Sequence, residues 1–411
     1  MLTQFVSFLG ALSILFANTV GILYLGNFLN GYTNGVYLGI VPIYTSEISQ
    51  PKLRKFTGSF LSITFNLGFT AVYIAGSLSH WKTAAIVQAV WPFVIFLLLI
   101  VCPDSPTWLV NKGKKDIAIG EMMKLRGNEA VAQREISRLE NNISKQAQNE
   151  SEASRSKYFQ RQITILKRQT FLRPCLVVTI MMSIGWHWTG AYVLILHTVE
   201  IFQEFEIPIP AVWASAGVGM YQLLGGLVGI VLSWYISRRK FYIGSGVLVF
   251  IGSCMLASVV HLKRYAFFVQ ILEENTFTRW ITLIAILIYF TGYSTGWIAV
   301  CFMLLGELLP SNGRELGSFI AVQCSNISAI IIVKTLPNLK SSLGIDGLFW
   351  LFSGASIFAM LFAYFCVPDT FGKTLEDIES HYRRICSHSD FRKNTKTDTG
   401  SYNMGYIKDQ R

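Results

Sequence analysis

The sequence predicts an all-α protein that crosses a membrane many times and is built from two homologous helical bundles. Of its 411 residues, 52% are hydrophobic and only 14% are charged, whereas soluble proteins carry about 25% charged residues. Apolar windows of about 17–25 residues, the length that spans a bilayer, recur along the chain. Two short motifs also occur twice at nearly equal separations. A long internal repeat in so apolar a chain is typical of transporters.

Ten spanning helices are expected from the apolar windows. They divide the chain into a first bundle (1–102), a cytoplasmic linker (103–172), a second bundle (173–367) and a cytoplasmic tail (368–411). In the linker, Ile117–Leu125 and Arg134–Leu139 have the pattern of short amphipathic helices at the membrane surface. The predicted spans are 2–18, 20–45, 57–78, 84–102, 173–198, 211–235, 241–261, 281–305, 317–338 and 347–367.

The positive charge of the chain, +11 in total, is explained by topology. Lys and Arg gather in alternate connections, in the linker and in the tail, which places these segments in the cytoplasm. Only the connection 262–279 departs from this pattern. An even number of spans then puts both termini inside. The basic residues therefore indicate contact with a lipid bilayer and give no sign of nucleic-acid binding.

The first repeated motif is Glu-x6-Arg, which occurs as Glu47–Arg54 and as Glu307–Arg314, 260 residues apart. Each copy lies where a span ends on the predicted cytoplasmic side. There an acid and a guanidinium can bridge neighbouring helices while that side is closed, and alternating access requires such bridges to break. These four residues are predicted to form a cytoplasmic gate. Simple anchoring by positive charge remains the alternative for the arginines of such a gate.

The second repeated motif is Pro-Asp, at Pro103–Asp104 and at Pro368–Asp369. It follows the fourth span in the first half but the sixth in the second half. The first bundle thus lacks two helices at its front by this count. A truncated gene model or isoform would explain the difference, and so would a genuine ten-span protein.

These residues carry a resemblance to the sugar porters of the major facilitator superfamily, and most of all to insect trehalose transporters. The family's Pro-Glu-Ser-Pro-Arg-Trp-Leu is similar to residues 103–109, and its Pro-Glu-Thr-Lys-Gly-Lys-Thr-Leu-Glu-Glu-Ile to residues 368–378. The stretches 26–54 and 325–352 also resemble the family's patterns. The resemblance implies the major facilitator fold, with the first visible span as the third of twelve helices. It also implies that Arg238 and Arg239 are gate partners.

The resemblance further implies facilitated diffusion of a sugar or a similar small neutral solute, without enzymatic activity or a cofactor, usually at the plasma membrane. No ion-coupling signature is visible, and no metal-ligand spacing occurs among the cysteines. The substrate, the oligomeric state and ion coupling cannot be read from the chain. The alternative function is a non-transporting sensor or interaction protein of the same family, or an incomplete gene product.

The predicted sugar site departs from the family pattern. The seventh-helix motif Gln-Gln-x-Ser-Gly-Ile-Asn is replaced by residues 186–192, which read Trp-His-Trp-Thr-Gly-Ala-Tyr, so every amide is lost. The tenth-helix Gly-Pro-x-Pro-Trp is replaced by 298–302, which removes two helix-breaking prolines and predicts less bending there. A packed core histidine and packed aromatic rings remain the alternative to solute contacts. The candidate substrate-binding residues are Asn66, His187, Thr189, Tyr192, Phe302 and Asn326.

Overall fold

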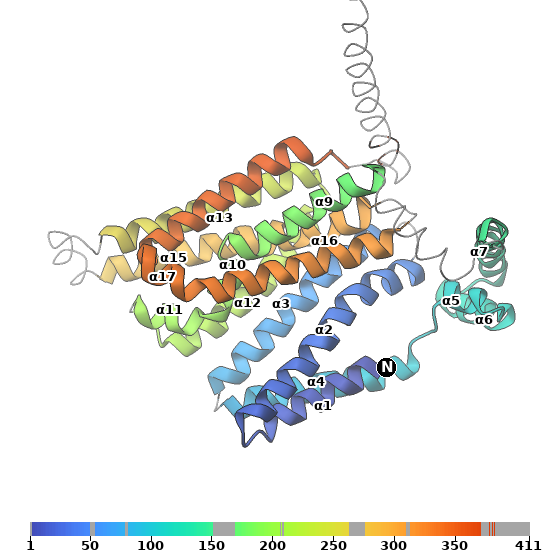
Figure 1. Ribbon diagram of the computed structural model, residues 1–411, viewed down its shortest axis with the longest axis horizontal. Helices are drawn as coiled ribbons and strands as arrows, with labels where there is room; N and C mark the ends of the chain where they lie inside the picture. The colour runs from blue at the N-terminus through green and yellow to red at the C-terminus, as the bar shows by residue number, and fades with distance from the viewer. Residues whose placement is uncertain are drawn as a thin grey trace, which may run out of the picture.

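The computed structural model describes residues 2–49, 54–78, 81–150, 169–205, 207, 209–262, 276–309, 313–370, 378, 380 and 382. Within these ranges the chain forms helices joined by turns, which confirms the all-α prediction. Backbone groups in a bilayer have no water to bond, so apolar spans satisfy them internally as helices. Figure 1 shows the long helices of the first half, α1–α4, lying along those of the second half, α9–α17.

The first half consists of four long helices that match the four predicted spans. Helix α1 packs against α2 and α4, and α3 packs against α4. The α1–α2 crossing is tight because Gly10 and Gly26 face each other. A Cβ at Gly26 would lie 2.8 Å from the carbonyl oxygen of Gly10, so small residues permit this close approach. The helices are α1 (Leu2–Leu15), α2 (Val20–Ile48), α3 (Arg54–Leu78) and α4 (Trp81–Val101).

The second half contains the other long apolar helices that the structure describes, and two of its predicted spans are interrupted. The span predicted at 173–198 and the one at 281–305 each contain a five-residue π-helical segment. The elements are α9 (Gln169–Ser183), η1 (Ile184–Trp188), α10 (Ala191–Leu196), α11 (Thr198–Glu204), α12 (Ala211–Leu232), α13 (Arg238–Leu262), α15 (Thr276–Gly292), η2 (Tyr293–Trp297), α16 (Ile298–Glu307) and α17 (Arg314–Cys366).

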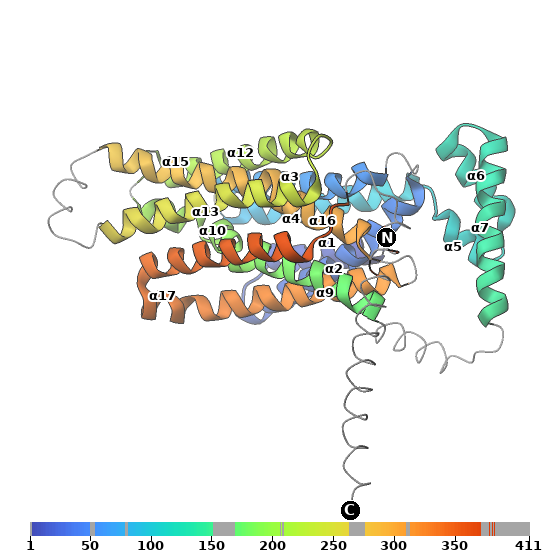
Figure 2. The same cartoon turned by 90° about the horizontal axis from the view of Figure 1, so that it is seen from above.

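Helix α17 covers both of the last two predicted spans. It is broken at Gly344, whose φ of 73° and ψ of 177° lie outside the helical region. The sequence predicted a connection of several residues here, and the structure instead turns at this glycine. Only glycine adopts such a backbone conformation without steric cost. Figure 2 shows the resulting two limbs of α17 lying side by side.

Five of the described helical segments are long and apolar enough to cross a membrane: α4, α12, α13, Arg279–Glu307 and Leu316–Cys366. The last of these contains both limbs of α17. Two apolar stretches, Leu2–Leu15 and Ile63–Leu78, are shorter. The protein is therefore a multi-pass membrane protein, and the total of ten spans stays a prediction.

The two halves meet along α2 and α3. Helix α3 packs against α12 and α16, while α2 packs against α17. Glycines of α12 make its contact with α3 close: a Cβ at Gly219 would lie 3.1 Å from Cα of Thr70. The hydroxyl of Thr70 donates to the carbonyl oxygen of Gly219 at 2.7 Å. The α3–α12 contact is thus a direct helix-on-helix seam between the halves.

The linker forms a small helical unit beside the end of the bundle (Figure 2). The two amphipathic helices predicted here lie within longer helices, α6 (Lys115–Arg126) and α7 (Glu129–Glu150), preceded by the short α5 (Pro106–Asn111). Their apolar side chains pack on one another in a core of their own, formed by Leu109, Ala118, Met122, Ala132 and Ile136.

Arg126 holds this unit against the first half. Its side chain is 6% exposed and pairs with Glu135 of α7 at 3.1 Å. Its Nη1 donates to the carbonyl oxygen of Ile48, at the end of α2, at 3.0 Å. We expect Arg126→Gln to release α5–α7 from α2 and to raise the rate of trypsin cleavage between residues 106 and 150 several-fold.

The matched control is Lys115→Gln, because the Lys115–Glu140 ion pair is about half exposed and such pairs contribute at most about 1 kcal/mol. Equal cleavage rates in the two variants, measured by timed digestion and mass spectrometry, would contradict the anchoring role of Arg126.

Candidate functional site

Glu307 joins three helix ends at one end of the second half. Its Oε1 lies 3.3 Å from Nη2 and 3.4 Å from Nε of Arg238, the first residue of α13. Its Oε2 accepts a hydrogen bond at 2.8 Å from the hydroxyl of Thr370, just beyond α17. The Arg238 side chain is 7% exposed and also donates to the carbonyl oxygen of Ser233. The predicted pairing of Glu307 with Arg238 is present in this geometry.

Glu47 makes the equivalent contact in the first half, where its Oε2 accepts a hydrogen bond from the hydroxyl of Ser105. Ser105 follows Pro103 by two residues, as Thr370 follows Pro368. The two sequence motifs of the repeat therefore meet in space in both halves, through a hydroxyl and a carboxylate. Sequence reasoning missed both hydroxyl residues, although their shared position after the repeated proline was visible.

The other three predicted gate residues are placed differently. The Arg54 side chain lies outside the described residues. The guanidinium of Arg314 donates to the carbonyl oxygen of Leu309 at 3.2 and 3.3 Å. The guanidinium of Arg239 lies 4.4 Å from the ring centre of Tyr364, on α17. Arg239 thus contacts an aromatic ring in a cation–π geometry, while its neighbour Arg238 contacts the carboxylate.

Removing either hydroxyl should loosen one half without affecting the other. Ser105 also accepts a hydrogen bond at 3.1 Å from the backbone of Trp108, at the start of α5. We therefore expect Ser105→Ala to cost about 1–2 kcal/mol and Thr370→Val to cost about 1 kcal/mol, each measured as a lower melting temperature in detergent. Ser13→Ala is the control, since its hydroxyl bonds only within its own exposed turn. A melting temperature equal to that of the control would contradict the contact.

An aromatic cluster lies where α3, η1 and α16 meet, between the two halves. The ring of Trp186 lies 4.9 Å from that of Phe302 and 6.0 Å from that of Phe65, centre to centre. Phe65 and Phe302 are 5.8 Å apart. Phe302 is 4% exposed, whereas the other two rings are partly exposed. The structure thus brings the predicted residue Phe302 into contact with the first half.

The predicted residues of η1 and its surroundings have different roles. His187 is 3% exposed, and its Nε2 lies 3.1 Å from the hydroxyl of Ser325 on α17. Its ring meets that of Tyr192 edge-on at 5.2 Å. Thr189 is fully buried, and its hydroxyl donates to the carbonyl oxygen of Gly185. Thr189 therefore supports the π-helical turn, and His187 ties that turn to α17.

Asn326 is partly exposed on α17. Two serines near it, Ser325 and Ser328, make the hydrogen bonds to η1. Ser325 bonds to His187, and Ser328 accepts a hydrogen bond at 2.8 Å from the indole of Trp188. These two serines were not predicted from the sequence. They lie three residues apart and therefore on one face of α17, so both can contact the same π-helical segment.

The loss of two prolines at 298–302 predicted less bending of this helix. The structure has a π-helical segment, η2, directly before this stretch. Ser294 and Thr295 donate to the carbonyl oxygens of Phe290 and Thr291, one turn earlier. Gly296 packs so closely on α13 that an added Cβ would lie 2.1 Å from Oγ of Ser245. Irregularity in this helix therefore comes from hydroxyl back-bonding and a glycine contact, which do not need proline.

Two buried amide side chains lie on the helices of the α3–α12 seam, Asn66 on α3 and Gln222 on α12. Asn66 and Gln222 are 0% exposed, and no side-chain atom of either amide has a hydrogen-bond partner among the described residues. Asn66 lies on the α12 backbone, because a Cβ at Gly226 would be 2.7 Å from its Nδ2. Gln222 is one turn away on the same helix. Gln222 was not predicted, because a lone amide in an apolar span does not show which residues surround it. Polar residues within spans often mark substrate pathways.

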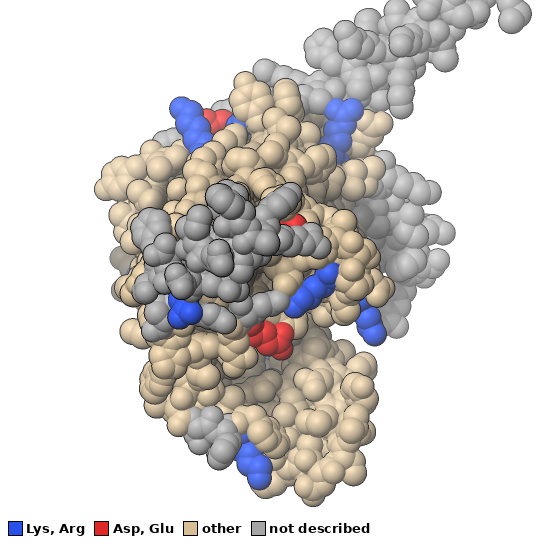
Figure 3. All heavy atoms as spheres, turned by 90° about the vertical axis from the view of Figure 1, so that its left-hand side faces the viewer, with Lys and Arg blue, Asp and Glu red and all other residues tan. Residues whose placement is uncertain are grey.

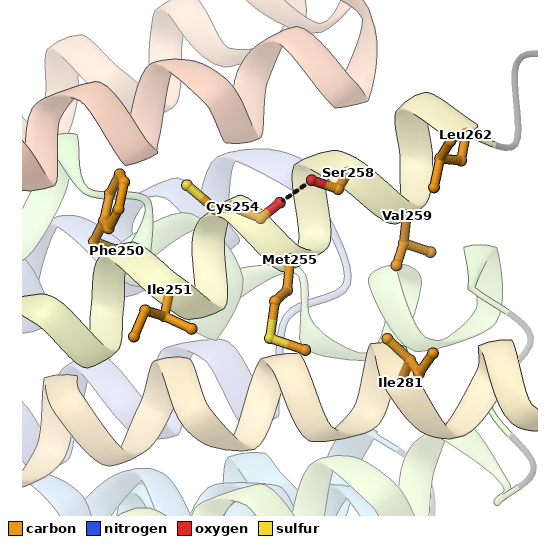
Figure 4. Close-up of a pocket in the computed structure, with 8 residues that line it drawn as sticks. All are labelled: Phe250, Ile251, Cys254, Met255, Ser258, Val259, Leu262 and Ile281. Atoms are coloured by element: carbon orange, nitrogen blue, oxygen red, sulfur yellow. Dashed lines mark hydrogen bonds between the residues drawn. The ribbon is translucent and has the colours of Figure 1, made fainter.

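Two hollows are visible on the outside of the molecule. One, of about 410 Å³, is lined by side chains of α13 and α15. Figure 4 shows its apolar lining and the hydroxyl of Ser258 directed to the carbonyl oxygen of Cys254, so it offers too few polar groups for a sugar. The other lies between the masses formed by the two halves, on the face seen in Figure 3.

Comparison with known proteins decides the family. A family model described as "Sugar (and other) transporter" matches residues 1–382. The chain belongs to the Sugar (and other) transporter family. The family consists of transporters and not of enzymes, as the sequence motifs predicted.

Relatives in this family include insect proteins. The facilitated trehalose transporter Tret1-2 homolog of Drosophila simulans is 28% identical over 369 residues, which cover 89% of this chain and 72% of the relative. Trehalose transporter 1 of Drosophila melanogaster is 28% identical over 369 residues, covering 90% of this chain and 41% of the relative. The predicted resemblance to insect trehalose transporters is confirmed.

Solved structures confirm the major facilitator fold. The proton:xylose symporter XylE bound to 6-bromo-6-deoxy-D-glucose superposes with a TM-score of 0.69 at 19% identity, covering 93% of this chain and 82% of that one. The inward-open form of XylE from E. coli gives a TM-score of 0.66 at 19% identity, covering 92% and 80%.

Proposed function

We propose that the protein is a facilitator that moves a sugar across the membrane by alternating access of its two halves. The observation that carries this proposal is a pair of amides at the seam between the halves, Asn66 and Gln222, which have no hydrogen-bond partner among the described residues. A buried polar group without a partner costs about 1–3 kcal/mol, and a solute bound between the halves would supply the missing hydrogen bonds. Sugar hydroxyls both donate and accept, which suits an amide.

The relatives support a sugar as the solute, since two of them are named for trehalose. The comparisons give no support to the non-transporting alternative. The contacts of Glu47 and Glu307 support a gate at the end nearest α5–α7. Contacts of this kind can bias an equilibrium between two states of the protein. We place this end and both termini in the cytoplasm, and the protein in the plasma membrane.

Uptake by proteoliposomes tests the proposal. The purified protein should equilibrate labelled glucose or trehalose faster than protein-free liposomes do, without accumulation above the outside concentration and without an effect of a protonophore. Uptake equal to that of protein-free liposomes would overturn the transport function. Accumulation that a protonophore abolishes would overturn facilitated diffusion and indicate coupling.

The site is tested by the double variant Asn66→Leu, Gln222→Leu. It should reduce initial uptake more than tenfold while leaving the protein folded, because leucine fills similar space without hydrogen bonds. The control is Gln203→Leu, an exposed amide on α11. Unchanged uptake in the double variant would remove the two amides from the site.

A further inference from the structure

Polar and apolar groups occupy different parts of the seam between the halves. The aromatic cluster of Phe65, Trp186 and Phe302 presents a wall of three rings, drawn from α3, η1 and α16. The amides of Asn66 and Gln222, without a hydrogen-bond partner in the described part of the chain, belong to α3 and α12, which pack on each other. Phe65 and Asn66 are consecutive on α3, so the ring wall lies next to one of the two amides.

The wall carries few hydrogen-bonding groups. Two of them, the indole Nε1 of Trp186 and the ring Nδ1 of His187 at its edge, lack a partner among the residues that the structure describes. The His187 ring stands edge-on to Trp186, with an interplanar angle of 81°. The faces of the three rings thus offer C–H and π surface only. An unsubstituted sugar, with hydroxyls around its whole rim, would leave some of those hydroxyls unpaired against this wall, at a cost of about 1–3 kcal/mol each.

A solute with one polar and one apolar part suits both surfaces. Its sugar ring would bond to the amides of Asn66 and Gln222, and its apolar group would lie against the rings. Aromatic stacking adds about 0.5–1.5 kcal/mol per ring beyond the burial of apolar area. We propose that this transporter prefers glycosides, sugars that carry an aryl or alkyl group, over unsubstituted sugars. This inference rests on the proposed transport function and names its substrate class.

The test compares phenyl β-glucoside with glucose in proteoliposomes. Half-saturation for phenyl β-glucoside should occur at a concentration at least ten times lower than for glucose. Trp186→Gln, which replaces ring surface by an amide, should reduce this ratio about tenfold. The control is Trp213→Gln, a tryptophan that is 54% exposed on α12 and away from the ring wall, where the ratio should not change.

Binding is measured separately from transport, by the shift in melting temperature of the detergent-solubilised protein with each sugar. Uptake that favours glucose, or a ratio that Trp186→Gln leaves unchanged, would overturn the glycoside preference and leave the transport function standing. Stabilisation by phenyl β-glucoside but not by glucose, without uptake of either, would overturn transport and support the substrate class. Absence of both binding and uptake would overturn both proposals.

Discussion

Glu307→Gln is expected to lower the melting temperature of the protein markedly, by a destabilisation of about 3 kcal/mol. The Arg238 side chain is 7% exposed and that of Glu307 is 18% exposed, so the pair is largely removed from water. Glutamine keeps an oxygen that can accept the hydrogen bond from Thr370, but it removes the charge opposite Arg238. A nearly buried guanidinium without its counter-charge accounts for most of the loss.

A double-mutant cycle separates this effect from simple loss of packing. Arg238→Met alone should also destabilise the protein, because Glu307 then loses its guanidinium partner. The combination of Arg238→Met with Glu307→Gln should be less destabilising than the sum of the two, by about 1–3 kcal/mol. Melting temperatures in one detergent measure all four proteins. Strict additivity would show that the two side chains do not interact.

The spans were predictable because a bilayer imposes one rule on every apolar segment. A stretch such as Trp81–Val101 has no alternative to a helix when water is absent, and its length alone indicates a crossing. The repeat was also predictable, since its motifs depend on residue type and spacing. The contact of each carboxylate with a hydroxyl, Glu47 with Ser105 and Glu307 with Thr370, follows the same repeat and is found in both halves.

The candidate site was less predictable, because its residues depend on which helices become neighbours. Phe302 and His187 were chosen by their position, and the structure places both near the seam. The role of Thr189 is local, because its hydroxyl is used by the turn that carries it. Gln222 became a candidate only when α12 was seen against α3. The choice between Arg238 and Arg239 likewise depends on the rotation of α13, which two adjacent arginines do not encode.

Local backbone detail was the least predictable part of the fold. The π-helical segments and the turn at Gly344 arise where helices press closely together or reverse within one residue. The sequence shows a glycine at such a place but does not show whether the space beside it is filled. Gly217 has nothing within 4 Å of an added Cβ, whereas Gly229 on the same helix would place one 2.1 Å from a backbone oxygen of Thr295.

Gly190→Ala should be the most damaging of the conservative changes near the site. Gly190 has φ of 90°, a conformation that costs other residues about 1–2 kcal/mol. Its Cβ would also lie 2.2 Å from Cδ2 of Phe352, and relieving such overpacking costs about 1–3 kcal/mol. The sum, about 2–5 kcal/mol, should appear as a large fall in melting temperature and as poor yield of folded protein.

Two further variants separate the causes. Gly113→Ala has the same kind of backbone strain, with φ of 73°, but nothing within 4 Å of the new Cβ, so it should cost about 1–2 kcal/mol. Gly354→Ala has neither strain nor neighbour and should be neutral or slightly stabilising, because alanine favours a helix. The difference between Gly190→Ala and Gly113→Ala then measures the clash with Phe352.

Since Gly190 directly follows the turn that carries Trp186 and His187, a fall in uptake larger than the loss of folded protein would show that this contact also positions the ring wall. A Gly190→Ala protein as stable as Gly113→Ala would show that Phe352 moves aside at no cost.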